Sequence, residues 1–339
     1  MRLFFVTMLA LFAGKCIAQD PHFSQFYSSP LTLNPAFTGK FDGDFRFAAN
    51  YRNQWPTINR AYETMTASID FQILKNKISP IDTWGVGLMA YTDKSAAGAV
   101  AFNYFSVSTA FHKGLDEDGY KQLGAGFQAT YSDMNIYTAN LKTGDQLSSQ
   151  GFTLPQDDPL LQQGTISKSY LDVNAGMLYT SSATDRDNFY VGASVYHINR
   201  PRVSFGTDGG ALYLLSPRAT FHAGGFFPIG DITTLHLSAL YSTQAGANET
   251  LLGGSLQFAA SNLENDDNPL SFYAGAWVRF GDALIPYLGL EYGEWRFGTT
   301  YDYNISSLKA ASQSRGGIEL SLIYINKKSG SKGLPCPKF

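Results

Sequence analysis

The stretch LSFYAGAWVRF, residues 270–280, alternates between two kinds of side chain along its whole length. One set is apolar, whereas the other is polar, small or amphipathic and includes Arg279. Successive side chains of a β-strand point to opposite faces, so this pattern predicts a strand with two chemically different faces. We expect the apolar face to meet lipid and the other face to line the inside of a barrel. The set predicted to face lipid is Leu270, Phe272, Ala274, Ala276, Val278 and Phe280.

Two further stretches repeat this alternation. In LDVNAGMLYT, residues 171–180, the outward set ends at Tyr179. In WRFGTTYDYN, residues 295–304, it begins at Trp295 and ends at Tyr303. Tyr and Trp at the ends of outward faces match the aromatic girdles of outer-membrane barrels. The pattern therefore favours a membrane barrel over a soluble β-sandwich or β-helix, which would bury its aromatic side chains in a core.

Segments of this kind recur along most of the chain. Outer-membrane strands are roughly 10 residues long, and single-chain bacterial barrels have an even number of them. We predict an all-β fold, a transmembrane antiparallel outer-membrane β-barrel of about fourteen strands. The strands are expected at residues 44–53, 62–73, 82–92, 99–112, 120–132, 168–181, 188–197, 216–227, 232–243, 249–259, 270–280, 283–292, 295–303 and 313–325.

The connections between strands give a second test of this arrangement, because such barrels have short periplasmic turns and longer extracellular loops. With both chain ends in the periplasm, long connections must follow odd-numbered strands. The two longest, 133–167 and 198–215, follow strands five and seven. The pattern is imperfect, since the connection after strand eleven is short and the one after strand two is not.

The composition agrees with a membrane barrel. The chain has 20 Tyr, 25 Phe and 33 Gly, and only 16% of its residues are charged. Such a content is typical of strands that show half of their side chains to lipid. The net charge of −3 is far from the basic balance of nucleic-acid-binding proteins. We therefore expect outer-membrane lipid, and no nucleic acid, among the partners.

Both ends of the chain lie outside the predicted barrel, which spans 44–325. Residues 1–18, MRLFFVTMLALFAGKCIA, have the basic residue, short apolar core and small final residue of a secretory signal peptide. After its removal, Cys336 in a periplasmic tail, 326–339, is the only cysteine, so no intrachain disulfide can form. We find no internal boundary and expect one barrel domain.

Residues 19–43, before the first strand, form a lead-in that is rich in Pro and aromatic residues. Each Pro fixes its own backbone angle and favours an extended residue before it, so the segment is ordered without a long helix or strand. Its many apolar side chains predict packing inside the periplasmic mouth of the barrel or against a periplasmic partner. A plug that only stabilises the barrel and a docking site both stay open. The residues that we assign to partner contact are Phe23, Tyr27, Asn34, Pro35 and Phe37.

Three segments carry a resemblance to a known family. DPHFSQFYSSPLTLNPAFTGK, residues 20–40, resembles the N-terminal signature of the PorP/SprF family of outer-membrane proteins of type IX secretion in Bacteroidetes. PYLGLEYGEWRFGTTYDYNISSLKAASQSRGGIELSLIY, residues 286–324, is similar to its closing strands, and the final CPKF to its C-terminal ending. The middle, roughly 130–265, matches only in the rhythm of its strands.

The resemblance implies a function that composition alone does not. Members of the family are needed for the export or surface attachment of particular large proteins, including gliding adhesins, that carry a type B C-terminal sorting domain. Relatives are also linked to the periplasmic ring and motor components of the same system. The resemblance thus implies a non-enzymatic outer-membrane protein that receives, anchors or helps to export one such cargo. An outer-membrane porin or hydrophobic-solute transporter is the alternative.

The connection 133–167 offers a surface for such a partner, because loops of this length are usually functional or disordered. Apolar and acidic side chains around PQDDP would form an apolar patch with an acidic rim. A lid folded into the barrel is an equally open interpretation. The residues that we assign to this patch are Phe152, Leu154, Asp157, Asp158 and Leu160.

Charged residues near the strands that close the barrel fall on the inward faces. Facing lipid would cost roughly 2–4 kcal/mol for an Arg at the membrane midplane, so we expect these charges to pair inside the lumen. Paired wall charges most often hold a barrel interior together, and a conducting path is the second interpretation. The residues are Arg46, Arg52, Arg279, Glu291, Arg296, Asp302, Arg315 and Glu319.

No pattern in the sequence predicts a catalytic, metal or cofactor site. GAGFQA, residues 124–129, fits a relaxed dinucleotide-binding spacing but lies within a predicted strand instead of opening a helix. The five His share no metal-ligand spacing, and no Ser, His and acid order stands out. We therefore expect a protein that is not an enzyme and that has no cofactor.

Overall fold

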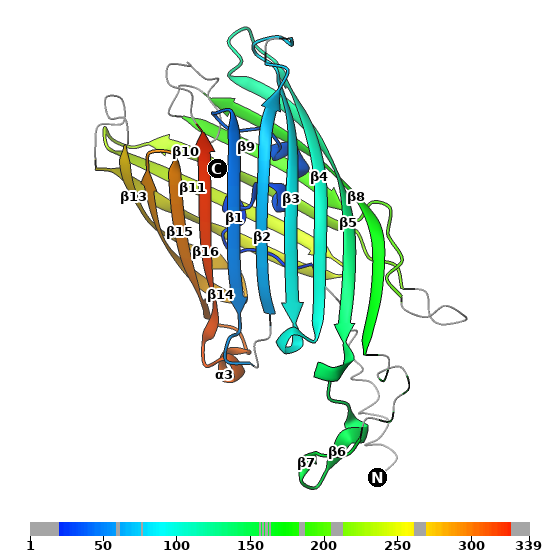
Figure 1. The fold of residues 1–339 in the computed structure, drawn as a ribbon. Coiled ribbons are helices and arrows are strands. Elements are labelled where there is room, and N and C mark those ends of the chain that lie inside the picture. Colours follow the sequence, from blue (N-terminus) through cyan, green and yellow to red (C-terminus); the bar gives the residue numbers. More distant parts are fainter. Residues whose placement is uncertain are drawn as a thin grey trace.

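The computed structural model describes residues 20–58, 62–75, 77–155, 157, 159, 162, 164–182, 187–204, 213–260 and 269–326. Fourteen long strands form one closed antiparallel barrel (Figure 1). The strands are β1 (Phe45–Gln54), β2 (Tyr62–Ile73), β3 (Thr83–Ser95), β4 (Val100–Gly114), β5 (Lys121–Tyr137), β8 (Thr165–Ser182), β9 (Asn188–Tyr196), β10 (Arg218–Pro228), β11 (Thr233–Gln244), β12 (Ala247–Ala259), β13 (Leu270–Arg279), β14 (Ala283–Tyr292), β15 (Trp295–Asn304) and β16 (Arg315–Asn326). The predicted fold class and number of strands are confirmed.

The barrel closes where its first and last strands meet. The β1–β16 register is continuous from Phe45 opposite Asn326 to Gln54 opposite Gly317. Closure leaves no unpaired sheet edge in the membrane, where an unpaired backbone group is expensive. In outer-membrane barrels with an even number of strands both ends of the barrel chain lie in the periplasm. We call the end with Phe45 and Asn326 the periplasmic end, and the opposite one the extracellular end.

The two faces of each strand differ as the alternation predicted. On β13, Phe272 is 49% exposed on the outside, whereas its neighbour Tyr273 is 4% exposed on the inside. On β8, Leu171 is exposed and Asp172 is buried. On β15, exposed Tyr301 likewise precedes buried Asp302. The outer wall therefore meets lipid, and the polar set faces inward.

The connection predicted at 133–167 is shorter in the structure, because β5 and β8 continue to pair as far as Tyr137 opposite Thr165. Polar side chains support these extra pairs. The Ser167 hydroxyl donates to Asn135 Oδ1 at 2.5 Å, and the Ser169 hydroxyl donates to Asp133 Oδ1 at 3.0 Å. Since this part of the two strands has no apolar outer face, periodicity alone did not identify it as strand.

The remaining elements are short. Three lie before β1, namely η1 (Phe26–Ser28), α2 (Pro30–Leu33) and η2 (Pro35–Phe37). The outer connections carry η3 (Ala96–Gly98), η4 (Thr138–Asn140), η5 (Gly144–Gln146), α3 (Lys309–Ser312) and a two-stranded hairpin of β6 (Leu147–Ser148) and β7 (Gly151–Phe152). Figure 1 shows that this hairpin projects from the extracellular end beyond β5 and β8. No helix among the described residues is long and apolar enough to cross a membrane.

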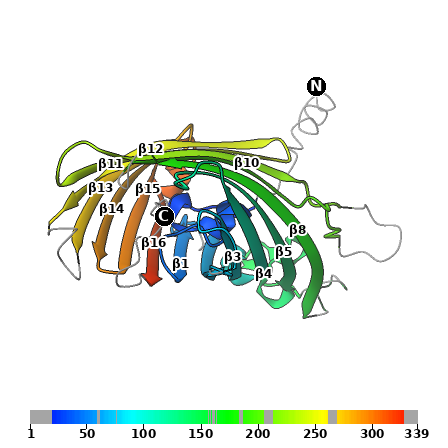
Figure 2. The ribbon, with the colours of Figure 1, turned by 90° about the horizontal axis from the view of Figure 1, so that it is seen from above.

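Residues 20–41, which we call the interior segment, lie within the ring of strands (Figure 2). Phe26, Leu33 and Phe37 belong to one buried cluster with wall residues that include Leu178 and Trp277. The segment also approaches the wall very closely. At Gly126 of β5 and Gly176 of β8, an added Cβ would collide with the Asn34–Ala36 stretch. Glycines at these two wall positions therefore make room for the segment.

Candidate functional site

The interior segment is held at the extracellular end by a cluster of charged wall residues. Arg52 of β1 pairs with Asp302 of β15 at 3.0 Å and with Glu319 of β16. Arg279 of β13 contacts the same Asp302 carboxylate at 2.9 Å. All four residues are at most 5% exposed. Buried charges of this kind require partners, and here every one has an opposite charge beside it.

Ser24 of the interior segment completes this cluster. Its hydroxyl donates to Asp302 Oδ1 at 2.8 Å, and its backbone N–H donates to Glu319 Oε1 at 2.6 Å. The next N–H, that of Gln25, donates to Glu319 Oε2 at 2.8 Å. The wall charges thus bind one another and also fix the segment. The alternation of the strands predicted these charges but not the role of Ser24.

A second ion pair lies at the periplasmic end. Arg46 of β1 binds Asp70 of β2 through two nitrogens, at 3.1 Å from Nε and 2.9 Å from Nη2. Arg46 Nη2 also donates to the Phe37 carbonyl at 3.0 Å, and the Gly39 N–H donates to Asp70 Oδ2 at 2.7 Å. Both charged side chains are at most 1% exposed. This pair therefore fixes the other end of the segment.

Asn34 anchors the middle of the segment. Its Nδ2 lies 3.0 Å from the Met177 carbonyl and 2.9 Å from His222 Nε2, and its Oδ1 accepts from the Ala36 N–H at 2.8 Å. The last bond caps η2, for which Pro35 supplies the first residue. The Asn-Pro pair thus both turns the chain and joins it to the wall.

The start of the described chain is held by a histidine between two carboxylates. His197, directly after β9, places Nε2 2.7 Å from Asp20 and Nδ1 2.9 Å from Asp172. Asp20 also contacts Arg218 at 3.4 Å and exchanges hydrogen bonds with Gln244. Burial opposes protonation of the imidazole, but the two carboxylates outweigh it and raise the pKa of His197 to about 9. His197 and Arg218 keep the pKa of Asp20 well below its usual range despite burial.

The lead-in residues that we assigned to partner contact lie inside the barrel. Phe23, Asn34, Pro35 and Phe37 are buried inside the barrel. Tyr27 is half-buried and stacks on Trp277 with ring centroids 4.8 Å apart. All five contact the barrel's own interior, so they meet a separate protein only if the segment moves.

Of the other charges predicted to face the lumen, two form an ion pair and one faces outward. Glu291 of β14 and Arg296 of β15 pair at 2.7 Å. The inward placement of Arg315 was wrong, because this residue is exposed opposite Tyr303 on the outer side. The register of β15 and β16 shifts between Asp302 and Tyr303. Such an irregularity reverses the face to which a side chain points.

The outer loop carries the remaining predicted residues. Phe152 and Leu154 are each 48% exposed, and Lys142 Nζ lies 5.5 Å from the centre of the Phe152 ring. Asp157 is exposed. Asp158 and Leu160 lie outside the described residues. The described part of the loop thus presents two apolar side chains at the extracellular end, beside a lysine.

Several residues that hold the interior segment were not predicted from the sequence. Asp70 and Asp172 lie on inward faces, so the alternation could have identified them. Asp20 lies before the first strand, where periodicity gives no signal. His197, the last residue of the strand predicted at 188–197, directly follows β9 in the structure. Within the described residues, no group of three or more His, Cys, Asp and Glu is placed to hold a metal ion.

The closed ring of strands and the interior segment within it define the class of protein. It is an outer-membrane β-barrel that encloses its own N-terminal segment. The model of one family, described as "Type IX secretion system membrane protein PorP/SprF", matches residues 16–324. The chain belongs to this family, and it is an outer-membrane component of type IX secretion. No curated protein matches it.

Solved structures that are similar to this chain include a toluene transporter and a homologue of FadL. The toluene transporter TbuX of Ralstonia pickettii is 10% identical with a TM-score of 0.50, over 89% of this chain and 94% of that one. A FadL homologue of Pseudomonas aeruginosa is 12% identical with a TM-score of 0.45, over 88% of this chain and 94% of that one. At 10% identity the likeness to TbuX is one of fold alone.

Proposed function

We propose that this barrel receives and anchors a specific large surface protein during type IX secretion. The cargo would carry a type B C-terminal sorting domain, and an adhesin of gliding motility is one candidate. Ring or motor components of the system would contact the barrel from the periplasm. The barrel takes part in recognition and attachment, and no catalytic role or cofactor is proposed.

The observation that carries the proposal is the bonding of the interior segment to the wall. Buried ion pairs hold it at both ends, through Asp302 and Glu319 at one and Asp70 at the other. A barrel filled in this way suits a fixed platform at the cell surface, with the N-terminal segment as a plug. A porin or hydrophobic-solute transporter would instead need a path past the segment.

The loop beyond β5 and β8 is the surface that we assign to the cargo. Phe152 and Leu154 are exposed at the extracellular end, and exposed apolar groups rimmed by polar ones commonly mark protein-binding sites. Both side chains lie on the outer loop, so replacing them leaves the bonds of the interior segment intact. The loop can therefore be tested separately from the barrel.

The test is a pull-down of the tagged protein from gently solubilised outer membranes, followed by mass spectrometry. From the wild type we expect one large protein with a C-terminal sorting domain. From the Phe152→Ser, Leu154→Ser double variant we expect about tenfold less of that protein. A tenfold loss corresponds to about 1.4 kcal/mol of binding free energy, as for loss of a hot-spot contact. Ile305→Ser is the control, because this residue is 52% exposed at the extracellular end but outside the loop.

Two results would contradict the proposal. If the wild-type protein retains no such cargo while reconstituted barrels conduct ions or pass solutes, transport is the function. If cargo is retained equally by wild type and the loop double variant, the loop is not its binding surface.

A further inference from the structure

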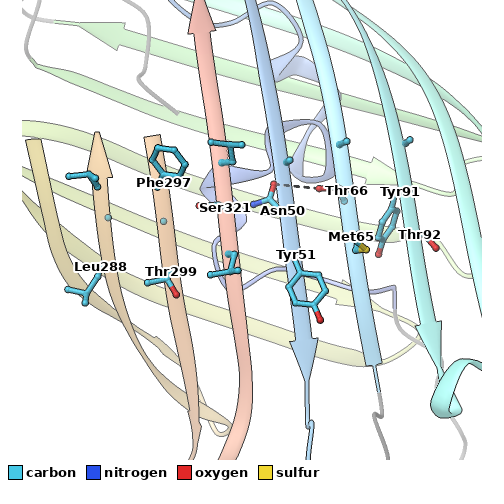
Figure 3. A pocket seen from close by; sticks show the side chains of 18 of the residues that line it. Asn50, Tyr51, Met65, Thr66, Tyr91, Thr92, Leu288, Phe297, Thr299 and Ser321 are labelled. Atoms are coloured by element: carbon cyan, nitrogen blue, oxygen red, sulfur yellow. Dashed lines mark hydrogen bonds between the residues drawn. The ribbon is translucent and has the colours of Figure 1, made fainter. Parts of the chain in front are cut away.

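A groove lies on the outside of the barrel, where the first and last strands meet (Figure 3). It has a volume of about 940 Å³ and is lined by residues of β14, β15, β16 and β1–β4. This volume is at the upper end of the ~300–1,000 Å³ that is usual for ligand pockets. None of its lining residues belongs to the interior segment. We call it the outer groove.

Three alanines at the same height of the barrel wall form the floor of the outer groove. Their short side chains leave this part of the outer surface recessed. Ala49 of β1 lies opposite Ala67 of β2, which lies opposite Ala90 of β3. Larger side chains continue the same row on both sides, with Leu322 opposite Ala49 and Phe105 opposite Ala90. The row is therefore a trough between two apolar ridges.

The lining has the chemistry of lipid tails. Leu288 and Phe105 on its two flanks are 63% and 61% exposed on the outer wall. The Thr92 hydroxyl donates to Asn103 Oδ1 at 3.0 Å, so these two polar side chains bond to each other. No lining residue that the structure describes is charged.

We propose that the outer groove binds the acyl chains of an outer-membrane lipid and retains them when the surrounding lipid exchanges. Its position on the lipid-facing wall, between the aromatic ends of the strands, makes hydrocarbon the medium that reaches it. Lipid tails are as apolar as the wall, so attachment depends on close packing instead of escape from water. A trough contacts a chain from its floor and both sides, whereas a convex wall contacts it from one side.

The experiment counts the lipids that stay bound through extraction. Wild-type protein is folded into vesicles of phosphatidylethanolamine and phosphatidylglycerol, extracted with a mild detergent, and analysed by native mass spectrometry. We expect one or two retained phospholipids. Ala67→Phe fills the trough and is expected to reduce retention about tenfold, because many close carbon contacts are lost together.

Two variants serve as controls. Ala274→Phe adds the same ring to an exposed outer alanine of β13 that does not line the groove, and it should retain lipid as the wild type does. Ala90→Leu fills the trough with a smaller change if Ala67→Phe fails to fold, which the gel mobility of unboiled protein reveals.

Three outcomes would overturn the proposal. The wild type retains no lipid; Ala67→Phe and Ala274→Phe retain equal amounts; or wild-type protein is a dimer that Ala67→Phe dissociates, which assigns the groove to a second copy of this chain. The readout does not involve cargo, so it stands apart from the function proposed above.

Discussion

At the scale of single residues, the wall charges show what periodicity can and cannot predict. The inward faces of Arg52 and Asp302 followed from the alternation, because a charge facing lipid is expensive. Their shared contact with Ser24 did not, since it joins residues far apart in the chain through a segment without periodicity. Arg315 was placed wrongly because one irregularity in register reverses a strand's faces.

Asp70→Ala tests the buried pair at the periplasmic end. Arg46 would remain as an unpaired charge at 0% exposure, so we expect the barrel to lose about 3–5 kcal/mol of unfolding free energy. Urea unfolding followed by gel mobility measures this. The exposed pair of Lys75 and Asp44 is the control, and Lys75→Ala should change stability by at most about 1 kcal/mol. Equal effects of the two variants would refute a special role for the buried pair.

His197 predicts a pH dependence at the start of the interior segment. Its pKa is raised from 6.5 to about 9, so its contribution is complete below pH 6.5 and is lost as the pH rises through about 9. The lowered pKa of Asp20 acts in the opposite sense, because that contribution is lost only in acid. We expect faster hydrogen exchange near Asp20 above pH 9 than at pH 6.5, after correction for the intrinsic rate. His197→Gln should abolish that difference, and a wild-type segment equally protected at both pH values would contradict the assignment.

At the scale of elements, strands were predictable and the interior segment was only partly so. Long alternating stretches such as β13 need no tertiary information, whereas the polar ends of β5 and β8 were missed because no lipid imposes a pattern there. The prolines of the lead-in predicted order without regular structure, and the structure forms three short helical turns there. Which wall residues those turns meet depends on contacts that a single sequence does not reveal.

A disulfide lock tests whether the interior segment must move. The Thr38 and Ser108 hydroxyls are 2.9 Å apart, joining the segment to β4. In a Cys336→Ser background, Thr38→Cys with Ser108→Cys should cross-link, and the fixed-platform proposal predicts unchanged cargo retention with or without reductant. Thr38→Cys alone is the control. Cargo retention that requires reductant would show that the function depends on release of the segment.

At the scale of the whole molecule, the enclosed segment has a consequence for assembly. Ser24 and Gln25 bond to Glu319 and Gln25 bonds to Ser321, across as many as 296 positions of the chain. These contacts of the interior segment can therefore form only after the last strand, β16, is in place. Contacts of such sequence separation slow folding, because loop closure precedes any gain. We therefore expect closure of the seam between β1 and β16 and filling of the barrel by the interior segment to occur together, because each depends on the position of β16.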